Sequence, residues 1–218
     1  MLGQTLFVQW KWSRDFLAFF TAIAFAAPLL IAWIALPHLG FTSPRELVNV
    51  GGAIGATVGG IAAISGVAIA WLGYGVDETV GHIYALSLPI TRLRALWYRA
   101  ATASALLVIP AVGVWVGATV AAGQMSLPST LESYSGSLAI RALLASWLAH
   151  ACMFALRHSA GRRAKAVLAI LAVVATVVPL IAVFAPSSRE LIVRVGDFIT
   201  SNPGPFGVFF GRWTLIDV

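Results

Sequence analysis

Long apolar runs separated by short polar stretches set the pattern of this chain. Five runs of about 20 residues or more lie at 16–37, 50–73, 99–122, 138–157 and 165–185. An α-helix rises about 1.5 Å per residue, so each run is long enough to cross a hydrocarbon core of about 30 Å. The pattern predicts an all-α, polytopic helical membrane protein, with residues 1–218 forming a single transmembrane domain.

The N-terminal segment 1–15 differs from the spans because it alternates aromatic and charged residues. Trp10 and Trp12 flank Lys11, and Arg14 follows. Aromatic rings beside cations favour the headgroup layer of a bilayer. We therefore expect an interfacial helix here, ahead of the first span.

The segments after the fifth run predict a different arrangement. In 186–204, apolar residues fall on one helical face and charged residues on the other, which is typical of a surface helix, followed by a loop at Asn202-Pro203-Gly204. With five spans before it, this helix and loop lie on the external side. Residues 205–218 are apolar but too short to cross a bilayer, so we expect the start of a sixth span or a re-entrant segment.

The second run is rich in glycine. Gly51, Gly55 and Gly59 are spaced by four residues and therefore lie on one helical face. Small residues at this spacing let two helix backbones approach closely in a membrane, so we interpret the three as a helix-packing seam. A slot for a cofactor or substrate is the alternative interpretation.

Composition agrees with a membrane protein. Hydrophobic residues make up 60% of the chain and charged residues 10%, whereas soluble domains carry about 25% charged residues. The mean hydropathy is +0.91. The net charge of +6 does not indicate nucleic-acid binding, because the Lys and Arg residues lie at the ends of apolar runs. The single cysteine, Cys152, excludes an internal disulfide and a cysteine metal cluster.

The basic residues also predict an orientation. Most of them fall in three segments that five spans place on one side of the membrane: Lys11 and Arg14; Arg92, Arg94 and Arg99; Arg157, Arg162, Arg163 and Lys165. Cationic loops stay in the cytoplasm by the positive-inside rule. The chain is thus expected in the bacterial cytoplasmic (inner) membrane with its N-terminus in the cytoplasm.

Catalytic and cofactor-binding motifs are missing from the sequence. It contains neither a G-x-x-x-x-G-K-[ST] phosphate loop nor an H-E-x-x-H zinc motif. The predicted spans lack acidic residues, which argues against ion-coupled transport. We therefore expect no enzyme, no metal and no cofactor in this chain. An intramembrane enzyme using His82 or His150 is the least favoured hypothesis, because a lone intramembrane histidine more often bonds a neighbouring helix.

The longest connector, 74–98, carries the most informative motif. Asp77 and Glu78 open it, and about ten residues later it reads Leu88-Pro89-Ile90-Thr91-Arg92. This arrangement resembles the cytoplasmic loop of permease subunits of second-type ABC exporters. Within this motif, Pro89 is expected to end one helix, and Thr91 is placed to cap the next.

The resemblance implies both a role and partners. In the family this loop forms a coupling helix that docks onto a separate ABC-type ATPase subunit, which holds ATP and magnesium. The resemblance extends to the N-terminal amphipathic helix, the cytoplasmic N-terminus and the external excursion after the fifth span. The family normally ends with a sixth span, which 205–218 is too short to form. The residues that would contact the ATPase are Asp77, Glu78, Leu88, Pro89, Ile90, Thr91, Arg92 and Arg94.

Two functions remain open from the sequence. The first is the membrane subunit of an ATP-driven exporter, paired with a second permease copy or a paralogue and surrounded by membrane lipid. The second is a structural or assembly subunit of a larger membrane complex that transports nothing itself. The glycine-rich second span suits both hypotheses.

Overall fold

The computed structural model describes residues 2–35, 44–79, 91–125, 131–158 and 215–217, with 166 and 194 as isolated positions. Contacts divide the chain into two units, Met1–Met153 with Arg212–Val218 and, separately, Phe154–Gly211. The described helices and strands belong to the first unit, except for the last turn of the final helix. The expected fifth span at 165–185 and surface segment at 186–204 therefore lie outside the described ranges, apart from the two isolated positions.

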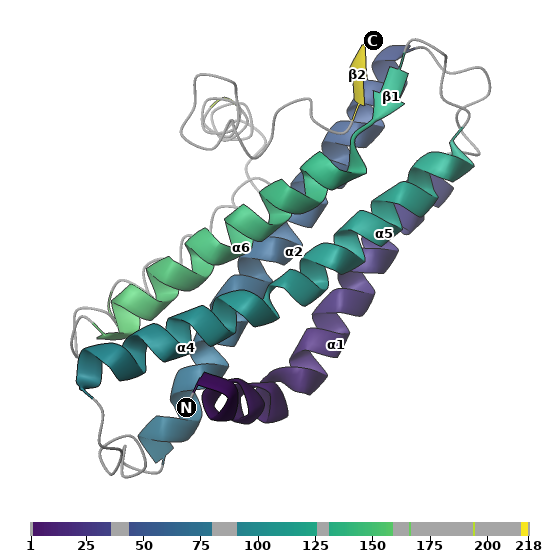
Figure 1. The fold of residues 1–218 in the computed structure, drawn as a ribbon. Coiled ribbons are helices and arrows are strands. Elements are labelled where there is room, and N and C mark those ends of the chain that lie inside the picture. The colour runs from purple at the N-terminus through teal and green to yellow at the C-terminus, as the bar shows by residue number, and fades with distance from the viewer. Residues whose placement is uncertain are drawn as a thin grey trace. The chain divides into compact units, whose positions relative to one another are not determined.

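The described part of the chain is helical apart from one short strand pair (Figure 1). The helices are α1 (Leu2–Ala35), α2 (Pro44–Thr79), α4 (Arg92–Leu106), α5 (Val108–Gln124) and α6 (Ser135–His158). Within the described residues, four helical segments are long and apolar enough to cross a membrane: Leu2–Ile34, Val50–Leu72, Leu93–Gln124 and Ser135–Leu156. These correspond to the first four predicted spans.

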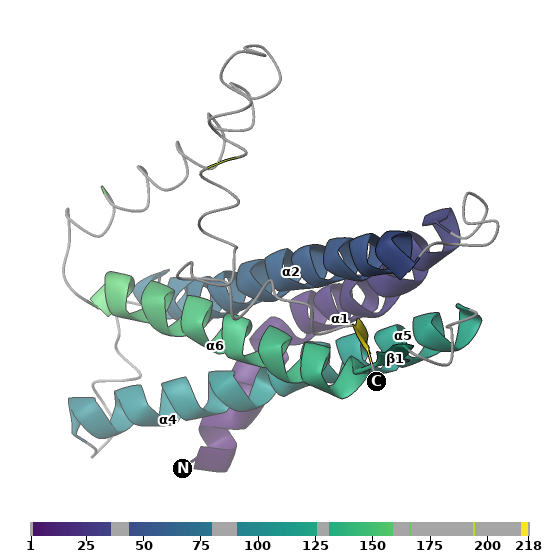
Figure 2. The ribbon, with the colours of Figure 1, turned by 90° about the horizontal axis from the view of Figure 1, so that it is seen from above.

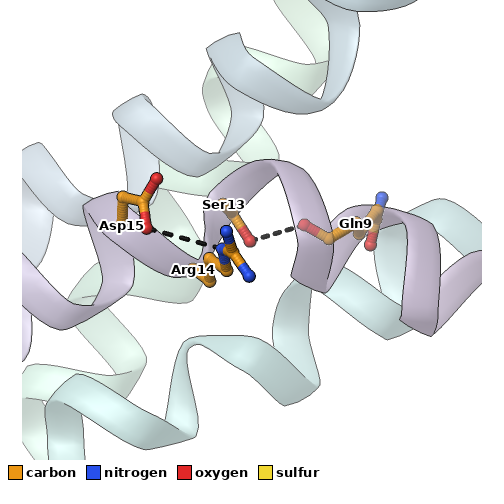
Figure 3. Close-up of polar contacts among 4 residues, drawn as sticks. All are labelled: Gln9, Ser13, Arg14 and Asp15. Atoms are coloured by element: carbon orange, nitrogen blue, oxygen red, sulfur yellow. Dashed lines mark hydrogen bonds and ion pairs between the residues drawn. The ribbon is translucent and has the colours of Figure 1, made fainter.

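The first helix is continuous where the sequence pattern predicts a separate interfacial helix over 1–15. Nothing between Arg14 and Phe16 breaks a helix, since that stretch contains neither Gly nor Pro. Figure 1 shows α1 changing direction after its first turns. The buried Ser13 hydroxyl donates to the Gln9 carbonyl oxygen at 2.7 Å, as Figure 3 shows. Such back-bonding to the preceding turn often bends helices.

The third candidate span is interrupted in the middle. Leu107 forms a turn between α4 and α5. Pro110 explains the position of the break, because it lacks the N–H group that would bond the Leu106 carbonyl, and its ring crowds that carbonyl. The Leu107 N–H still bonds the Ala103 carbonyl at 3.1 Å. The span is therefore two helices in series, where the sequence pattern predicts one helix over 99–122.

The interior of the first unit is built from small and aliphatic side chains of all four spanning segments. One buried cluster joins α1, α2, α5 and α6, and a second joins α1, α2, α4 and Leu107. Many large apolar side chains point outward instead, among them Trp33, Ile64, Trp97, Trp115 and Ile140. An apolar exterior around a close-packed interior is what a helical bundle in lipid requires.

Glycines set the closest helix contacts. A Cβ atom at Gly117 of α5 would overlap the Phe25 carbonyl oxygen of α1, and one at Gly113 would lie 3.0 Å from the Thr21 carbonyl oxygen. A Cβ at Gly66 of α2 would overlap the Ser146 carbonyl oxygen of α6. The backbones of these helices thus meet with no room for a side chain.

One strand from the segment between α5 and α6 pairs with a strand near the C-terminus. β1 (Leu131–Ser133) pairs antiparallel with β2 (Leu215–Asp217), and Glu132 lies opposite Ile216. Residues 215–217 are extended, and they lie within the segment 205–218 that the sequence predicts to be the start of a sixth span or a re-entrant segment. Strand pairing gives their backbone groups hydrogen-bond partners outside a helix. Residues 205–214 lie outside the described ranges.

Candidate functional site

The predicted coupling segment is bounded by two helix ends whose charges oppose the helix dipole. The second helix continues to Thr79, so Asp77 and Glu78 lie in its last turn, inside what was expected to be a loop. Helix α4 begins at Arg92, so Arg92 and Arg94 lie in its first turn. Acids at a helix C-terminus and cations at a helix N-terminus are each unfavourable, typically by about 0.3–1 kcal/mol.

The predicted cap of the second of these helices is confirmed. Thr91 has an extended backbone, with φ −64° and ψ 146°, and its side-chain oxygen accepts a hydrogen bond from the Arg94 N–H at 3.4 Å. The Ala95 N–H bonds the Thr91 carbonyl at 3.0 Å. Both bonds use backbone groups at the helix start, so they fix where α4 begins. Leu88, Pro89 and Ile90 lie outside the described residues.

A polar cluster joins α4 to the first turns of α1. The Gln9 side-chain amide donates to the Arg99 carbonyl at 3.4 Å, and the Thr102 hydroxyl donates to the Gln9 side-chain oxygen. Thr102 is buried and also lies within hydrogen-bond distance of the Tyr98 and Arg99 carbonyls. In both views the N-terminus lies beside α4 (Figures 1 and 2). No local pattern in the sequence indicates this cluster, because Gln9 and Thr102 are 93 positions apart.

The same two stretches of chain stay in register beyond this cluster. Thr21 meets Gly113 and Phe25 meets Gly117, at an offset within one residue of that between Gln9 and Thr102. The first helix therefore runs parallel to α4 and α5 in turn. Its first turns contact α4, and its later turns contact α5.

Two rows of small residues lie on different sides of α2. Gly51 and Gly55 are buried and Gly59 is half-buried, so these seam residues lie on the inner side of the helix. Gly52 and Gly60 are exposed, and a Cβ at either would meet nothing within 4 Å. A second face of small residues thus points away from this chain.

His150 lies on α6 where that helix contacts α2. The residue is 4% exposed, and its backbone nitrogen would lie 3.0 Å from a Cβ at Gly66. Within the described ranges, no group of three His, Cys, Asp or Glu side chains is placed to hold a metal ion. His82 lies outside the described residues. The burial of His150 fits a helix-packing role.

The centre of the bundle is nearly filled. A space of about 10 Å³ lies between the helices, bordered by Ser65, Ser146 and Pro110 among other residues. This volume holds about one water molecule at most. Both serine hydroxyls bond carbonyls of their own helices at 2.8 Å. A solute path through this point would need the helices to separate.

No family model matches this chain, and neither the curated proteins nor the solved structures give a match.

Proposed function

We propose that this chain is the membrane-spanning subunit of an ATP-driven exporter and receives its driving force from a separate ATPase at residues 77–94. The observation that carries the proposal is the charge arrangement at the two helix ends. Acids in the last turn of α2 and arginines in the first turn of α4 both oppose the helix dipole. A partner surface with charges of both signs would turn these unfavourable placements into contacts.

The local geometry supports a transmitting role for α4. The Thr91 cap fixes the start of the helix, so a push on Arg92 or Arg94 acts on an ordered end. The Gln9–Thr102 contact then joins α4 to α1. The turn at Leu107 separates α4 from α5, so α4 is a distinct element of the third span. Displacement of the predicted coupling segment would therefore move α4 and the first turns of α1 together.

The orientation and location belong to the same proposal. Basic residues at the predicted cytoplasmic ends favour a cytoplasmic N-terminus in the bacterial inner membrane. The space at the bundle centre is too small for a solute. The export path is therefore expected between two copies of the chain, or between this chain and a paralogue.

Co-purification tests this function. The full chain, extracted from its native membrane in mild detergent, is expected to retain an ATPase identifiable by mass spectrometry and by ATP hydrolysis. Arg94→Glu should weaken retention of that ATPase, because a cation that meets an acid becomes a repelling charge. Lys11→Glu is the matched control, since it makes the same exchange at another exposed position near the same end of the bundle.

A charge swap separates docking from internal pairing. If Glu78 and Arg94 served only to attract each other, Glu78→Arg combined with Arg94→Glu would restore the stability that either single variant loses. If each meets the partner, the double variant should retain less ATPase than either single variant. Absence of any co-purifying ATPase, with Arg94→Glu behaving like the wild type, would reject the proposal.

An assembly subunit without transport is the second candidate, favoured by the outward small-residue face of α2. Gly52, Ala56 and Gly60 are exposed and spaced by four, which suits close approach of a helix from another chain. Gly60→Leu should leave the fold intact and weaken that association. A stable complex that contains no ATPase and is lost in Gly60→Leu would favour this candidate over the exporter.

A further inference from the structure

An apolar groove runs along the outer surface between α1 and α5. Its volume is about 720 Å³, and its lining is apolar except for Arg14 at one end and Thr21, whose hydroxyl donates to the Leu17 carbonyl of its own helix. The groove forms because small side chains line α1, where exposed Ala18 and Ala22 lie between the larger Arg14 and Phe25. The opposite wall is a row of half-exposed valines, Val108, Val112 and Val116.

The length of the groove matches one leaflet of a bilayer. From Arg14 to Phe25 the helix rises about 16 Å at 1.5 Å per residue. Half of a hydrocarbon core is about 15 Å. An acyl chain that enters at the membrane surface beside Arg14 therefore reaches about the bilayer midplane at Phe25.

The end of the groove at the membrane surface carries a positive charge, which could bind the phosphate of a lipid. Arg14 and Trp10 line this end. The Arg14 side chain is 62% exposed and lies 3.5 Å from Asp15, which is 89% exposed. Exposed ion pairs of this kind contribute only about 0–1 kcal/mol, so Arg14 can exchange Asp15 for a phosphate. Guanidinium binds phosphate in a bidentate manner, and indole rings favour the headgroup layer.

We propose that this groove binds an anionic phospholipid, with one acyl chain along Ala18, Ala22 and the valine row and the phosphate on Arg14. Two features indicate this lipid. The positive charge of Arg14 at one end complements a phosphate, and the apolar lining along the rest is about as long as one leaflet is thick. The inference needs the chain to lie in a membrane, and it does not rest on a role in export.

The test measures lipid retained by the purified full chain. The protein is equilibrated in bilayers of equal parts phosphatidylglycerol and phosphatidylcholine, extracted gently, and analysed by native mass spectrometry. We expect one phosphatidylglycerol retained in preference to phosphatidylcholine. Arg14→Gln should reduce this preference about tenfold, which is the loss expected for one hydrogen bond to a charged group. Lys11→Gln removes a cation outside the groove lining and should change nothing.

A second variant tests the acyl-chain half of the site. Ala22→Phe fills the groove from an exposed position and should lower retention of both lipids, whereas Ala101→Phe adds the same ring to an exposed position of α4 outside the groove. Circular dichroism and gel filtration establish that each variant folds. Equal retention in wild type, Arg14→Gln and Ala22→Phe would overturn the proposal. So would an Ala22→Phe variant that loses self-association while keeping its lipid, since a second copy would then cover the groove.

Discussion

Replacing Gly66 with alanine tests how closely α2 and α6 pack. The added Cβ would overlap the Ser146 carbonyl oxygen and lie 3.0 Å from the His150 backbone nitrogen. Both neighbours are backbone atoms of a helix, so neither can rotate away as a side chain would. The helices would have to move apart. Gly60 on the same helix is the matched control, because a Cβ there would meet nothing within 4 Å.

The magnitude follows from two opposing terms. Alanine stabilises a helix interior by about 1 kcal/mol relative to glycine, and this gain is common to Gly66→Ala and Gly60→Ala. Overpacking a filled interior costs about 1–3 kcal/mol, and only Gly66→Ala incurs it. The difference in unfolding free energy between the two variants is therefore expected to be about 1–3 kcal/mol, with Gly66→Ala the less stable.

Thermal unfolding in detergent, followed by far-ultraviolet circular dichroism, measures this difference. For a chain of this length, each kcal/mol shifts the midpoint by about 2–4 °C. All proteins are scanned at one heating rate, since unfolding of such proteins is often irreversible. If the Gly66→Ala and Gly60→Ala variants melted at the same temperature, the close contact between α2 and α6 would be refuted.

Three further outcomes follow from single contacts. Thr91→Ala should speed amide exchange in the first turn of α4 and cost about 1 kcal/mol, while Thr91→Ser keeps the cap. Thr102→Val removes one hydroxyl at nearly constant shape and should cost about 1 kcal/mol, with faster exchange in the turns of α1 around Gln9; unchanged exchange there would contradict the link between α1 and α4. Pro110→Ala supplies a donor for the Leu106 carbonyl, so the new amide at position 110 should exchange as slowly as its neighbours. Fast exchange there would show that Pro110 is not the cause of the break.

The spanning segments could be predicted because a helix that crosses lipid needs a long run of apolar residues, and such a run is visible in a local stretch of sequence. The helix ends could not, because apolarity stops at the membrane surface while helices continue beyond it. The second helix runs on to Thr79, and α4 begins at Arg92, both within the expected loop at 74–98. The helix continues through Gly73 and Gly75, and the residues from Val76 to Thr79 contain neither Gly nor Pro.

The direction in which each face points was harder to predict than the helices themselves. On α2, Gly51, Gly55 and Gly59 form one row of small residues, and Gly52, Ala56 and Gly60 form another beside it. Both rows satisfy the same spacing rule, so the choice of the buried row depends on the helices that pack against α2. The proposed docking residues illustrate a different limit. A motif indicated Thr91 as a cap, but the Gln9–Thr102 contact needed the three-dimensional arrangement.

The pairing of α1 with α4 has a consequence for how the chain is made. Gln9 bonds the Arg99 backbone across 90 positions of sequence. At a synthesis rate of about 5–20 residues per second, roughly 5–18 s pass between the translation of these two residues. During that interval the first turns of α1, with Trp10, Trp12 and Lys11, lack the helix that they later contact. Their aromatic and cationic side chains suit the headgroup layer, so the membrane surface would hold this segment until α4 is inserted.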